Sequence, residues 1–150
     1  MTEPRPRLFL LLDRAAHAVR QRLDRQAQDA LGISTVQLGA LFHLVGHEGC
    51  LQKELASALG IQPAAVTGLV DRMETAGLVQ RRAHATDARA QRLHATAAGK
   101  RVAAKARPVV ATLQDALLAG FDAAEIAVIT RFLTAAAQRD LRPPAEGLPP

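Results

Sequence analysis

The sequence predicts a mainly helical protein that carries one small β-hairpin, and three observations favour this fold class. Hydrophobic residues make up 49% of the 150 residues, whereas aromatic residues make up only 3%. The core must therefore consist mostly of Ala, Leu and Val, a mixture that favours packed helices over sheets. Apolar residues also recur at helical spacing over most of the chain, and residues 78–96 depart from that spacing. At this length we expect one compact unit, residues 1–150.

The N-terminal part of the chain predicts two helices. Apolar side chains recur at helical spacing over residues 8–31, and Gly32 supplies a stop. Ser34 can cap a second helix while Gln37 reaches back to its amide, which is the pattern of a capping box. This second helix should run to about Gly46.

Residues 51–79 predict two short helices joined by a tight turn. An apolar stripe runs from Leu51 to Leu59, Gly60 permits a left-handed turn, and Pro63 suits the first turn of the next helix. Two short helices arranged in this way form a helix-turn-helix.

The segment that follows predicts a hairpin and then two further helices. Two short stretches, 78–82 and 92–96, flank a turn-prone segment and should pair as β-strands. A hairpin directly after a helix-turn-helix is a wing, so residues 34–96 predict a winged helix-turn-helix. Helical spacing then resumes over residues 97–119 and again over 123–141.

The remaining helices, 8–31 and 97–141, favour a helical dimerisation lobe beside the winged helix-turn-helix. Their apolar stripes need partners that the small winged lobe cannot supply. Asp122 and Glu125 repeat the capping-box pattern at the start of the last helix. Residues 143–150 contain four prolines and one glycine, so we expect a flexible tail.

Positive charge is concentrated between residues 81 and 101. This stretch holds six basic residues and one acid, a net charge of +5, which equals the formal net charge of the whole chain. A localised basic patch on an otherwise neutral protein is typical of a surface that binds a polyanion. Nucleic acid is the first candidate, ahead of a membrane surface or an acidic partner.

The second helix of the helix-turn-helix carries the candidate base-reading residues. A glutamine can pair with adenine, an arginine with guanine or a phosphate, and an Ala or Thr methyl group can touch a thymine methyl. The alternative is a solvent-facing helix without a partner. The candidates that packing leaves free are Gln62, Ala64, Ala65, Thr67, Gly68 and Arg72, with Asp71 beside them.

The predicted wing supplies the candidate backbone contacts. Arg89 at its tip is suited to insertion into a minor groove, and Asp87 can hold Arg89 or Arg92 by a charge-assisted hydrogen bond. We expect Arg81, Arg82 and Arg92 to contact phosphates, which gives affinity but little sequence information. The alternative is a solvated run of charges.

These residues carry a resemblance to a known family. The segment DARAQRLHATAAG is similar to the wing signature of the multiple-antibiotic-resistance regulator (MarR) family, in which Asp, any residue and Arg precede an apolar-Thr pair and a glycine. Asp87, Arg89, Thr96 and Gly99 fit this signature, whereas Ala95 stands where a leucine is usual.

The segment AAVTGLVDRMETAGLVQR resembles the recognition helix of the same family and its exit into the first wing strand. It departs from the common pattern at the helix start, where Gln62, Pro63, Ala64 and Ala65 replace a more polar run. The matching positions are Thr67, Asp71, Arg72, Gly77, Leu78 and Arg81.

The resemblance implies a homodimer in which the first helix and the last two helices interlock. Each protomer would then offer one winged helix to half of a palindromic operator in double-stranded DNA, most simply as a repressor. Members of the family usually bind small aromatic or anionic effectors in a cleft between the two lobes. By resemblance only, the residues lining such a cleft are Arg14, His17, Phe42, His43 and Val109.

The lone cysteine and the paired histidines each have two interpretations. Cys50 cannot form an intramolecular disulfide, and no signal peptide is evident, so we expect a reducing cytoplasm. Some MarR members sense oxidants through a cysteine in the first helix, but Cys50 lies elsewhere, and we expect a small, partly buried thiol. His43 and His47 have chelating spacing, and Glu48 and His17 are possible further ligands. We nevertheless expect structural histidines, with no metal and no other cofactor.

The function that follows is DNA binding rather than catalysis. No nucleophile–base pair, phosphate loop or carboxylate cluster stands out, so we do not expect an enzyme. The apolar run LFLLL is too short to span a bilayer, so we expect no membrane partner. We predict a homodimeric, ligand-responsive, sequence-specific transcriptional regulator. The alternative is a winged-helix protein-interaction module that does not bind DNA, for which retained basic strands and a wing-tip arginine would be unexpected.

Overall fold

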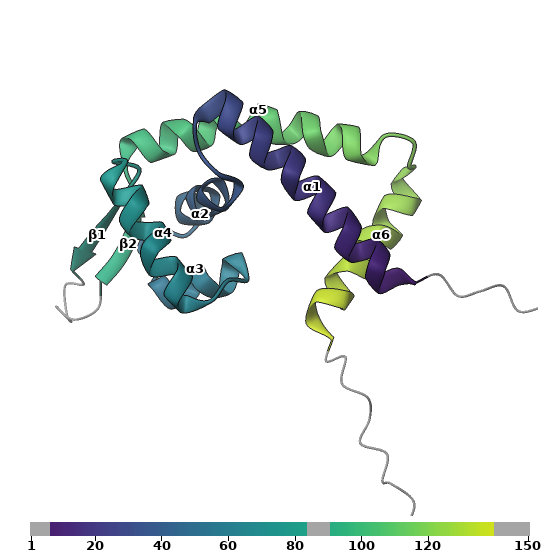
Figure 1. Cartoon of the computed structure of the whole chain (residues 1–150), viewed down its shortest axis with the longest axis horizontal. Helices are drawn as coiled ribbons and strands as arrows, with labels where there is room; N and C mark the ends of the chain where they lie inside the picture. The colour runs from purple at the N-terminus through teal and green to yellow at the C-terminus, as the bar shows by residue number, and fades with distance from the viewer. Residues whose placement is uncertain (1–6, 84–90, 140–150) are drawn as a thin grey trace, which may run out of the picture. The chain divides into compact units, whose positions relative to one another are not determined.

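A computed structural model describes residues 7–83 and 91–139 (Figure 1). As the sequence predicts, the described residues form a mainly helical fold with one antiparallel hairpin. In chain order the elements are α1 (Leu8–Leu31), α2 (Thr35–Gly46), α3 (Gln52–Leu59), α4 (Pro63–Thr75), β1 (Val79–Ala83), β2 (Gln91–Ala95), α5 (Ala97–Leu118) and α6 (Ala123–Gln138). The predicted tail at 143–150 lies outside the described residues.

The chain divides into two compact units, residues 1–113 and 114–150. The first unit contains α1 to α4, the hairpin and most of α5. Its core extends along α5 as far as Ala106 and the partly buried Val110. The second unit contains the end of α5 and α6, in which no residue is buried. The physical reason for the division is that the core ends before residue 113.

Local signals place the helix ends where the sequence predicts them. Gly32 and Gly60 adopt left-handed conformations, with φ of 68° and 63°, and end α1 and α3. Ser34 Oγ accepts the backbone N–H of Gln37 at 3.2 Å, and Gln37 Oε1 accepts the N–H of Ser34 at 2.9 Å, which completes the predicted capping box. Asp122 begins α6 with the same motif.

The core of the first unit lies where α2, α3, α4 and β2 meet. α2 and α4 each supply four buried residues. The helix-turn-helix of α3 and α4 therefore rests on a well-packed base. The largest fully buried side chains are Leu41, Leu44, Leu55, Val66, Val70, Met73 and Leu93.

The hairpin is displaced by one residue from each predicted strand. β1 and β2 pair with Val79 opposite Ala95 and Ala83 opposite Gln91, whereas the sequence predicts strands at 78–82 and 92–96. The difference arises because Thr96 leaves the strand to start α5, where its hydroxyl accepts the N–H of Gly99 at 3.0 Å.

A third segment borders β2 on the side away from β1. Gly49 donates its backbone N–H to the Leu93 carbonyl at 3.0 Å, and Leu93 donates its N–H to the Cys50 carbonyl at 2.8 Å. The wing is therefore fastened to the chain that leads into α3, and its strands are held against the core.

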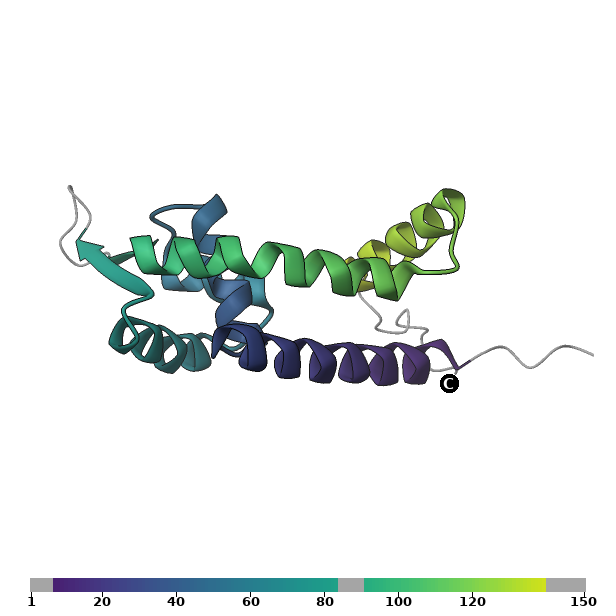
Figure 2. The same cartoon turned by 90° about the horizontal axis from the view of Figure 1, so that it is seen from above.

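α1 and α5 are the two longest helices, with 24 and 22 residues (Figure 2). Of the residues in α1, only Ala27 is buried. Within the described ranges no single helix is long and apolar enough to cross a membrane. Taken together, α1 and α2 have the length and composition of a membrane span, but the chain bends by 76° at their junction.

Candidate nucleic-acid interface

The predicted base-reading residues lie on one side of α4. The other side of the helix is buried in the core through Val66, Leu69, Val70 and Met73. Gly68 is half-buried, and a Cβ atom built there would lie 3.4 Å from Arg72 Nη1, so the arginine extends back along the helix. The exposed residues are Gln62, Ala64, Ala65, Thr67, Asp71 and Arg72. α4 therefore presents a surface of small and polar side chains that can approach another molecule closely.

A side-chain contact joins α3 to this surface. Gln52 Nε2 donates to Thr67 Oγ1 at 3.4 Å, and both residues are accessible to solvent. The hydrogen bond connects the start of α3 to the middle of α4. It leaves the Thr67 methyl group available for an apolar contact with a base.

Arg81 is paired with two carboxylates of α4. Its guanidinium group pairs with Asp71 at 2.7 Å and also with Glu74, and 18% of its side chain is exposed. Partial burial lowers the pKa of Arg81, but the hydrogen bond to Asp71 and the charges of Glu74 and Asp71 outweigh this effect and raise it. The two carboxylates thus join the Arg81 side chain on β1 to α4. A phosphate contact by Arg81 stays a prediction.

Arg92 is also engaged within the protein. Its Nη1 donates to the Gly49 carbonyl at 2.6 Å, and its Nε is buried and has no hydrogen-bond partner among residues 7–83 and 91–139. The side chain is half-buried and ties β2 to the segment before α3. A phosphate contact by Arg92 stays a prediction.

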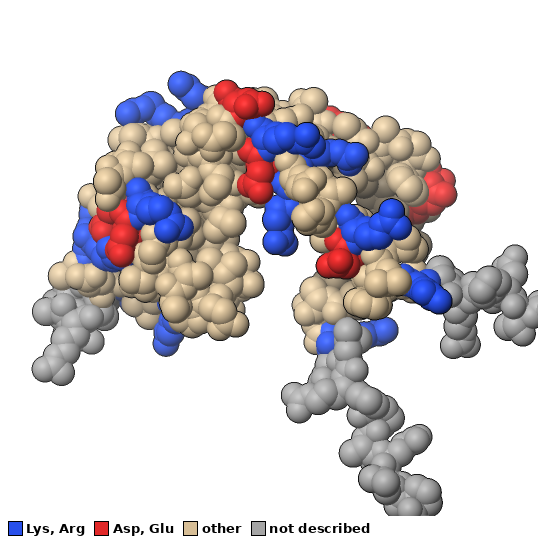
Figure 3. Space-filling view, viewed as in Figure 1, with Lys and Arg blue, Asp and Glu red and all other residues tan. Residues whose placement is uncertain are grey.

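Arg82 keeps the exposure that the sequence analysis expects of a phosphate contact. Lys100 pairs with Glu48, and the hydrogen bond and charge of Lys100 lower the pKa of that carboxyl. Figure 3 shows acidic side chains beside basic ones near α4 and β1. The positive charge available to a polyanion is therefore smaller than the count of basic residues suggests.

The tip of the wing lies outside the described residues, which skip 84–90. The predicted minor-groove residue Arg89 and its predicted partner Asp87 both fall in this gap. Their roles stay predictions.

Sequence reasoning missed Glu74. This residue lies in the last turn of α4, where a carboxylate is unfavourable because the helix dipole is negative there. A carboxylate in such a position, followed by an arginine just beyond the next turn, indicates an ion pair between the helix and the strand that follows it. Glu74 accepts the backbone N–H of Arg81 at 2.7 Å in addition to its guanidinium.

The helix-turn-helix and β1 match a family model. Residues 31–90 match the model of the MarR family. This segment belongs to the MarR family of transcriptional regulators. The match covers α2, α3, α4 and β1, which are the elements that build the surface described above.

Solved structures share the fold of the chain beyond that segment. BpsR of Bordetella bronchiseptica is 20% identical to this chain, with a TM-score of 0.82, and the match covers 90% of this chain and 96% of BpsR. The DNA binding of BpsR is regulated by 6-hydroxynicotinic acid. MepR of S. aureus, in a complex with DNA, is 22% identical, with 85% and 94% covered and a TM-score of 0.79. CouR of Rhodococcus jostii RHA1, bound to p-coumaroyl-CoA, is 23% identical, with 92% and 96% covered and a TM-score of 0.80.

Two residues of the MarR wing signature, Thr96 and Gly99, pack and hydrogen-bond within the protein at the start of α5. Thr96 Oγ1 donates to the Gly77 carbonyl at 2.7 Å and accepts the N–H of Gly99. Gly99 is buried directly against the Leu78 backbone. These two residues fasten the start of α5 to the turn between α4 and β1, so they support the interface without being part of it.

The residues that the MarR resemblance suggests for an effector cleft lie on three helices of the first unit. Arg14 and His17 are exposed on α1, Phe42 and His43 are half-buried on α2, and Val109 is half-buried on α5. His17 Nε2 lies 2.9 Å from Gln21 Nε2 in the next turn of α1. Over residues 7–83 and 91–139, no hydrogen bond or ion pair joins the α1 pair to the α2 pair. Their role in binding an effector stays a prediction.

The paired histidines stack on each other. The rings of His43 and His47 have centroids 4.4 Å apart and an interplanar angle of 13°, and His47 Nδ1 lies 3.2 Å from the His43 carbonyl. In the described part of the chain, no three His, Cys, Asp or Glu side chains are grouped closely enough to hold a metal ion.

Cys50 is more buried than the sequence analysis expects, with 6% of the residue exposed. Burial, with a smaller contribution from the charge of Glu54, raises the pKa of the thiol. A high thiol pKa lowers the fraction of reactive thiolate, so the position of Cys50 favours a packing role.

Proposed function

We propose that this MarR-family chain is a sequence-specific DNA-binding transcriptional regulator that works in the cytoplasm as a homodimer, most simply as a repressor. The observation that carries the proposal is the exposed, small-residue face of α4, which the core supports from behind and two carboxylates connect to β1. A helix with such a face can lie in a major groove because no bulky side chain holds it away from the base edges.

Within this proposal, α4 reads bases and the wing contacts the backbone. Gln62, Thr67 and Arg72 are the polar residues of α4 that can pair with base edges or a thymine methyl, while Ala64, Ala65 and Gly68 permit close approach. Arg82 contacts a phosphate, and Arg89 enters the adjacent minor groove. Asp71 sits near this surface, and its pairing with Arg81 reduces its repulsion of phosphates.

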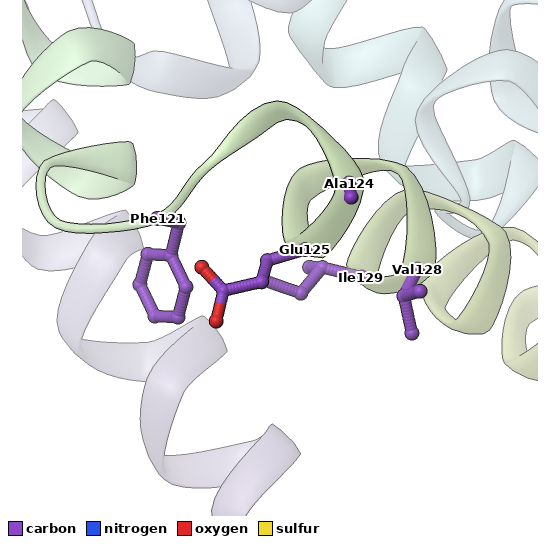
Figure 4. A pocket seen from close by; sticks show the side chains of 5 residues that line it. All are labelled: Phe121, Ala124, Glu125, Val128 and Ile129. Atoms are coloured by element: carbon purple, nitrogen blue, oxygen red, sulfur yellow. The ribbon is translucent and has the colours of Figure 1, made fainter.

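Exposed apolar side chains support a homodimer. On α1 they are Leu8, Phe9, Leu10 and Leu11, of which Phe9 is 74% exposed. In the second unit, Phe121, Ala124, Glu125, Val128 and Ile129 line an open depression of about 410 Å³ (Figure 4). A second copy of the chain can cover such surfaces, and a two-fold axis then spaces two α4 helices about 10 bp apart on a palindromic operator.

We further propose that the regulator responds to a small aromatic or anionic effector. BpsR and CouR support this idea, since the first is regulated by 6-hydroxynicotinic acid and the second binds p-coumaroyl-CoA. The candidates on this chain are Arg14, His17, Phe42, His43 and Val109. An effector with different affinities for two states of the dimer would shift the spacing of the α4 helices and change DNA affinity.

The first experiment measures DNA binding by fluorescence anisotropy. Wild type and Arg89→Ala are titrated against a duplex from the upstream region of the gene and against a scrambled duplex, over a series of salt concentrations. We expect wild type to prefer its own duplex by about a thousandfold, with a steep salt dependence that Arg89→Ala weakens. Equal or absent binding to both duplexes, unchanged by the substitution, would instead support a protein-interaction module.

A further inference from the structure

The network of Glu74, Arg81 and Asp71 joins the predicted recognition helix to the wing. Glu74 Oε1 accepts the backbone N–H of Arg81 at 2.7 Å, and its other oxygen accepts the guanidinium. The second arm of the guanidinium donates to Asp71 at 2.7 Å. One arginine on β1 is thereby bound to two successive turns of α4.

The hairpin register explains why the backbone N–H of Arg81 is available. Arg81 pairs with Leu93, whose own N–H and carbonyl face the segment Gly49–Cys50 on the far side of β2. The two residues therefore form a non-hydrogen-bonded pair, so the N–H of Arg81 points away from β2. Among the described residues, Glu74 supplies the hydrogen-bond acceptor for this donor.

The three side chains of the network differ in how far they are exposed to solvent. The exposed fractions of the side chains are 18% for Arg81, 31% for Glu74 and 59% for Asp71. The contact between Arg81 and Glu74 is thus the more shielded one, and shielding strengthens a charge-assisted hydrogen bond. Asp71 is the outer member, nearest to solvent.

We propose that Glu74 and Arg81 are positioning residues for DNA recognition, which hold α4 and β1 as one rigid unit so that helix and wing engage the duplex together. This inference rests on the proposed function. It assigns Arg81 to the support of α4 rather than to a phosphate.

The proposal reverses the simple electrostatic expectation for Glu74. A carboxylate close to a DNA-binding surface repels phosphates, so its removal should strengthen binding if charge alone matters. If Glu74 positions α4, its removal weakens binding and reduces the preference for the correct sequence. The sign of the effect therefore separates the two explanations.

The experiment compares Glu74→Ala with Glu48→Ala in the anisotropy assay. Both substitutions remove an accessible carboxylate that is paired with a basic residue of the 81–101 stretch. We expect Glu74→Ala to lower the preference for the cognate duplex by about tenfold or more, whereas Glu48→Ala does not lower it. Glu74→Gln, which keeps a hydrogen-bond acceptor for the Arg81 N–H, should give a smaller loss. Urea unfolding of each variant checks that it is folded at the assay temperature.

Salt dependence identifies the role of Arg81. A residue that contacts a phosphate contributes about one unit to the slope of log affinity against log salt. We expect Arg81→Ala to lower the sequence preference with an unchanged slope, whereas Arg82→Ala should flatten the slope by about one unit. The double variant Glu74→Ala, Arg81→Ala should lose no more sequence preference than the more affected single variant, since both substitutions break the same network.

The outcomes separate this inference from the proposed function. If wild type does not prefer its cognate duplex, the proposed function fails and the positioning role fails with it. If wild type is selective but Glu74→Ala binds as well as or better than wild type, only the positioning role is overturned. A flattened slope for Arg81→Ala, with Glu74→Ala neutral, would make Arg81 a phosphate contact.

Discussion

At the level of single residues, Gly99 shows how closely the start of α5 approaches the rest of the first unit. A Cβ atom at this position would overlap the Leu78 carbonyl oxygen and lie 3.0 Å from Leu41 Cδ2. The backbone of Gly99 is helical, without a positive φ, so the need for glycine is one of space. The neighbouring Leu78 carbonyl is backbone and also accepts the N–H of Thr96, so it cannot move away easily.

We expect Gly99→Ala to lower the free energy of unfolding by about 2 kcal/mol, because the overlap outweighs the gain in helix propensity. Gly46→Ala is the matched control, since Gly46 ends α2 with no atom within 4 Å of a Cβ and no positive φ. The control should be neutral or slightly stabilising. Urea unfolding of both variants measures the difference, and equal stabilities would contradict the predicted overlap.

At the level of elements, the sequence predicts what depends on nearby residues. The ends of α1, α2 and α3 follow from left-handed glycines and a capping box, each of which acts within a few residues. The hairpin strands are displaced by one residue because Thr96 is recruited to start α5, and its partner Gly77 lies 19 residues away.

The contacts of the arginines within the protein were predicted less well than the elements. The exposed side of α4 follows from helical periodicity, which depends on the sequence alone. The engagement of Arg92 depends on Gly49, which is 43 residues away, and that of Arg81 depends on the register of β1 against β2. Tertiary packing therefore decides which arginines have partners within the protein, and a count of basic residues does not.

A second prediction concerns the junction of α1 and α2. Asp24 on α1 accepts the backbone N–H of Thr35 at 2.8 Å and also the Thr35 hydroxyl. The hydrogen bond from the Thr35 hydroxyl makes the larger contribution, and the one from its backbone N–H the next, to a lowered pKa of Asp24. The carboxylate thus stabilises the folded state at pH values above the pKa of Asp24 in the unfolded chain, and this contribution is lost as the pH falls through the folded pKa.

We expect Asp24→Asn to lower the free energy of unfolding by about 1 kcal/mol at pH 7. The difference from wild type should shrink at acidic pH, once Asp24 of the wild type is protonated as well. Asp29→Asn, on the exposed surface of the same helix, is the control and should have little effect. Urea unfolding from pH 7 to about pH 3 measures the three proteins, and a difference that does not change with pH would argue against the carboxylate.

At the level of the whole molecule, large hydrophobic side chains are exposed on both units. Ten large hydrophobic residues are exposed among the described positions. Most of them lie on α1, at the end of α5 and on α6 or just before it. Surfaces of this kind usually mark protein interfaces. The exposed residues are Leu8, Phe9, Leu10, Leu11, Val36, Leu117, Phe121, Val128, Phe132 and Leu133.

Val128 on α6 offers a direct test of the proposed homodimer. The side chain is 53% exposed and lines the open depression of the second unit. If a second chain covers this surface, Val128→Asp buries an unpaired carboxylate in the interface and should weaken dimerisation by about tenfold or more. Thr130→Asp, at an exposed polar position of the same helix, introduces the same charge and controls for helix propensity.

Analytical ultracentrifugation over a range of protein concentrations measures the dimer dissociation constant of each variant. We expect wild type and Thr130→Asp to remain dimeric where Val128→Asp dissociates. The consequence should extend to DNA, because a monomer presents one α4 helix to one half-site and loses the contribution of the second. The affinity for a full palindrome should therefore fall much more than the affinity for an isolated half-site. If Val128→Asp dimerises as tightly as Thr130→Asp, this face of α6 is not part of the interface.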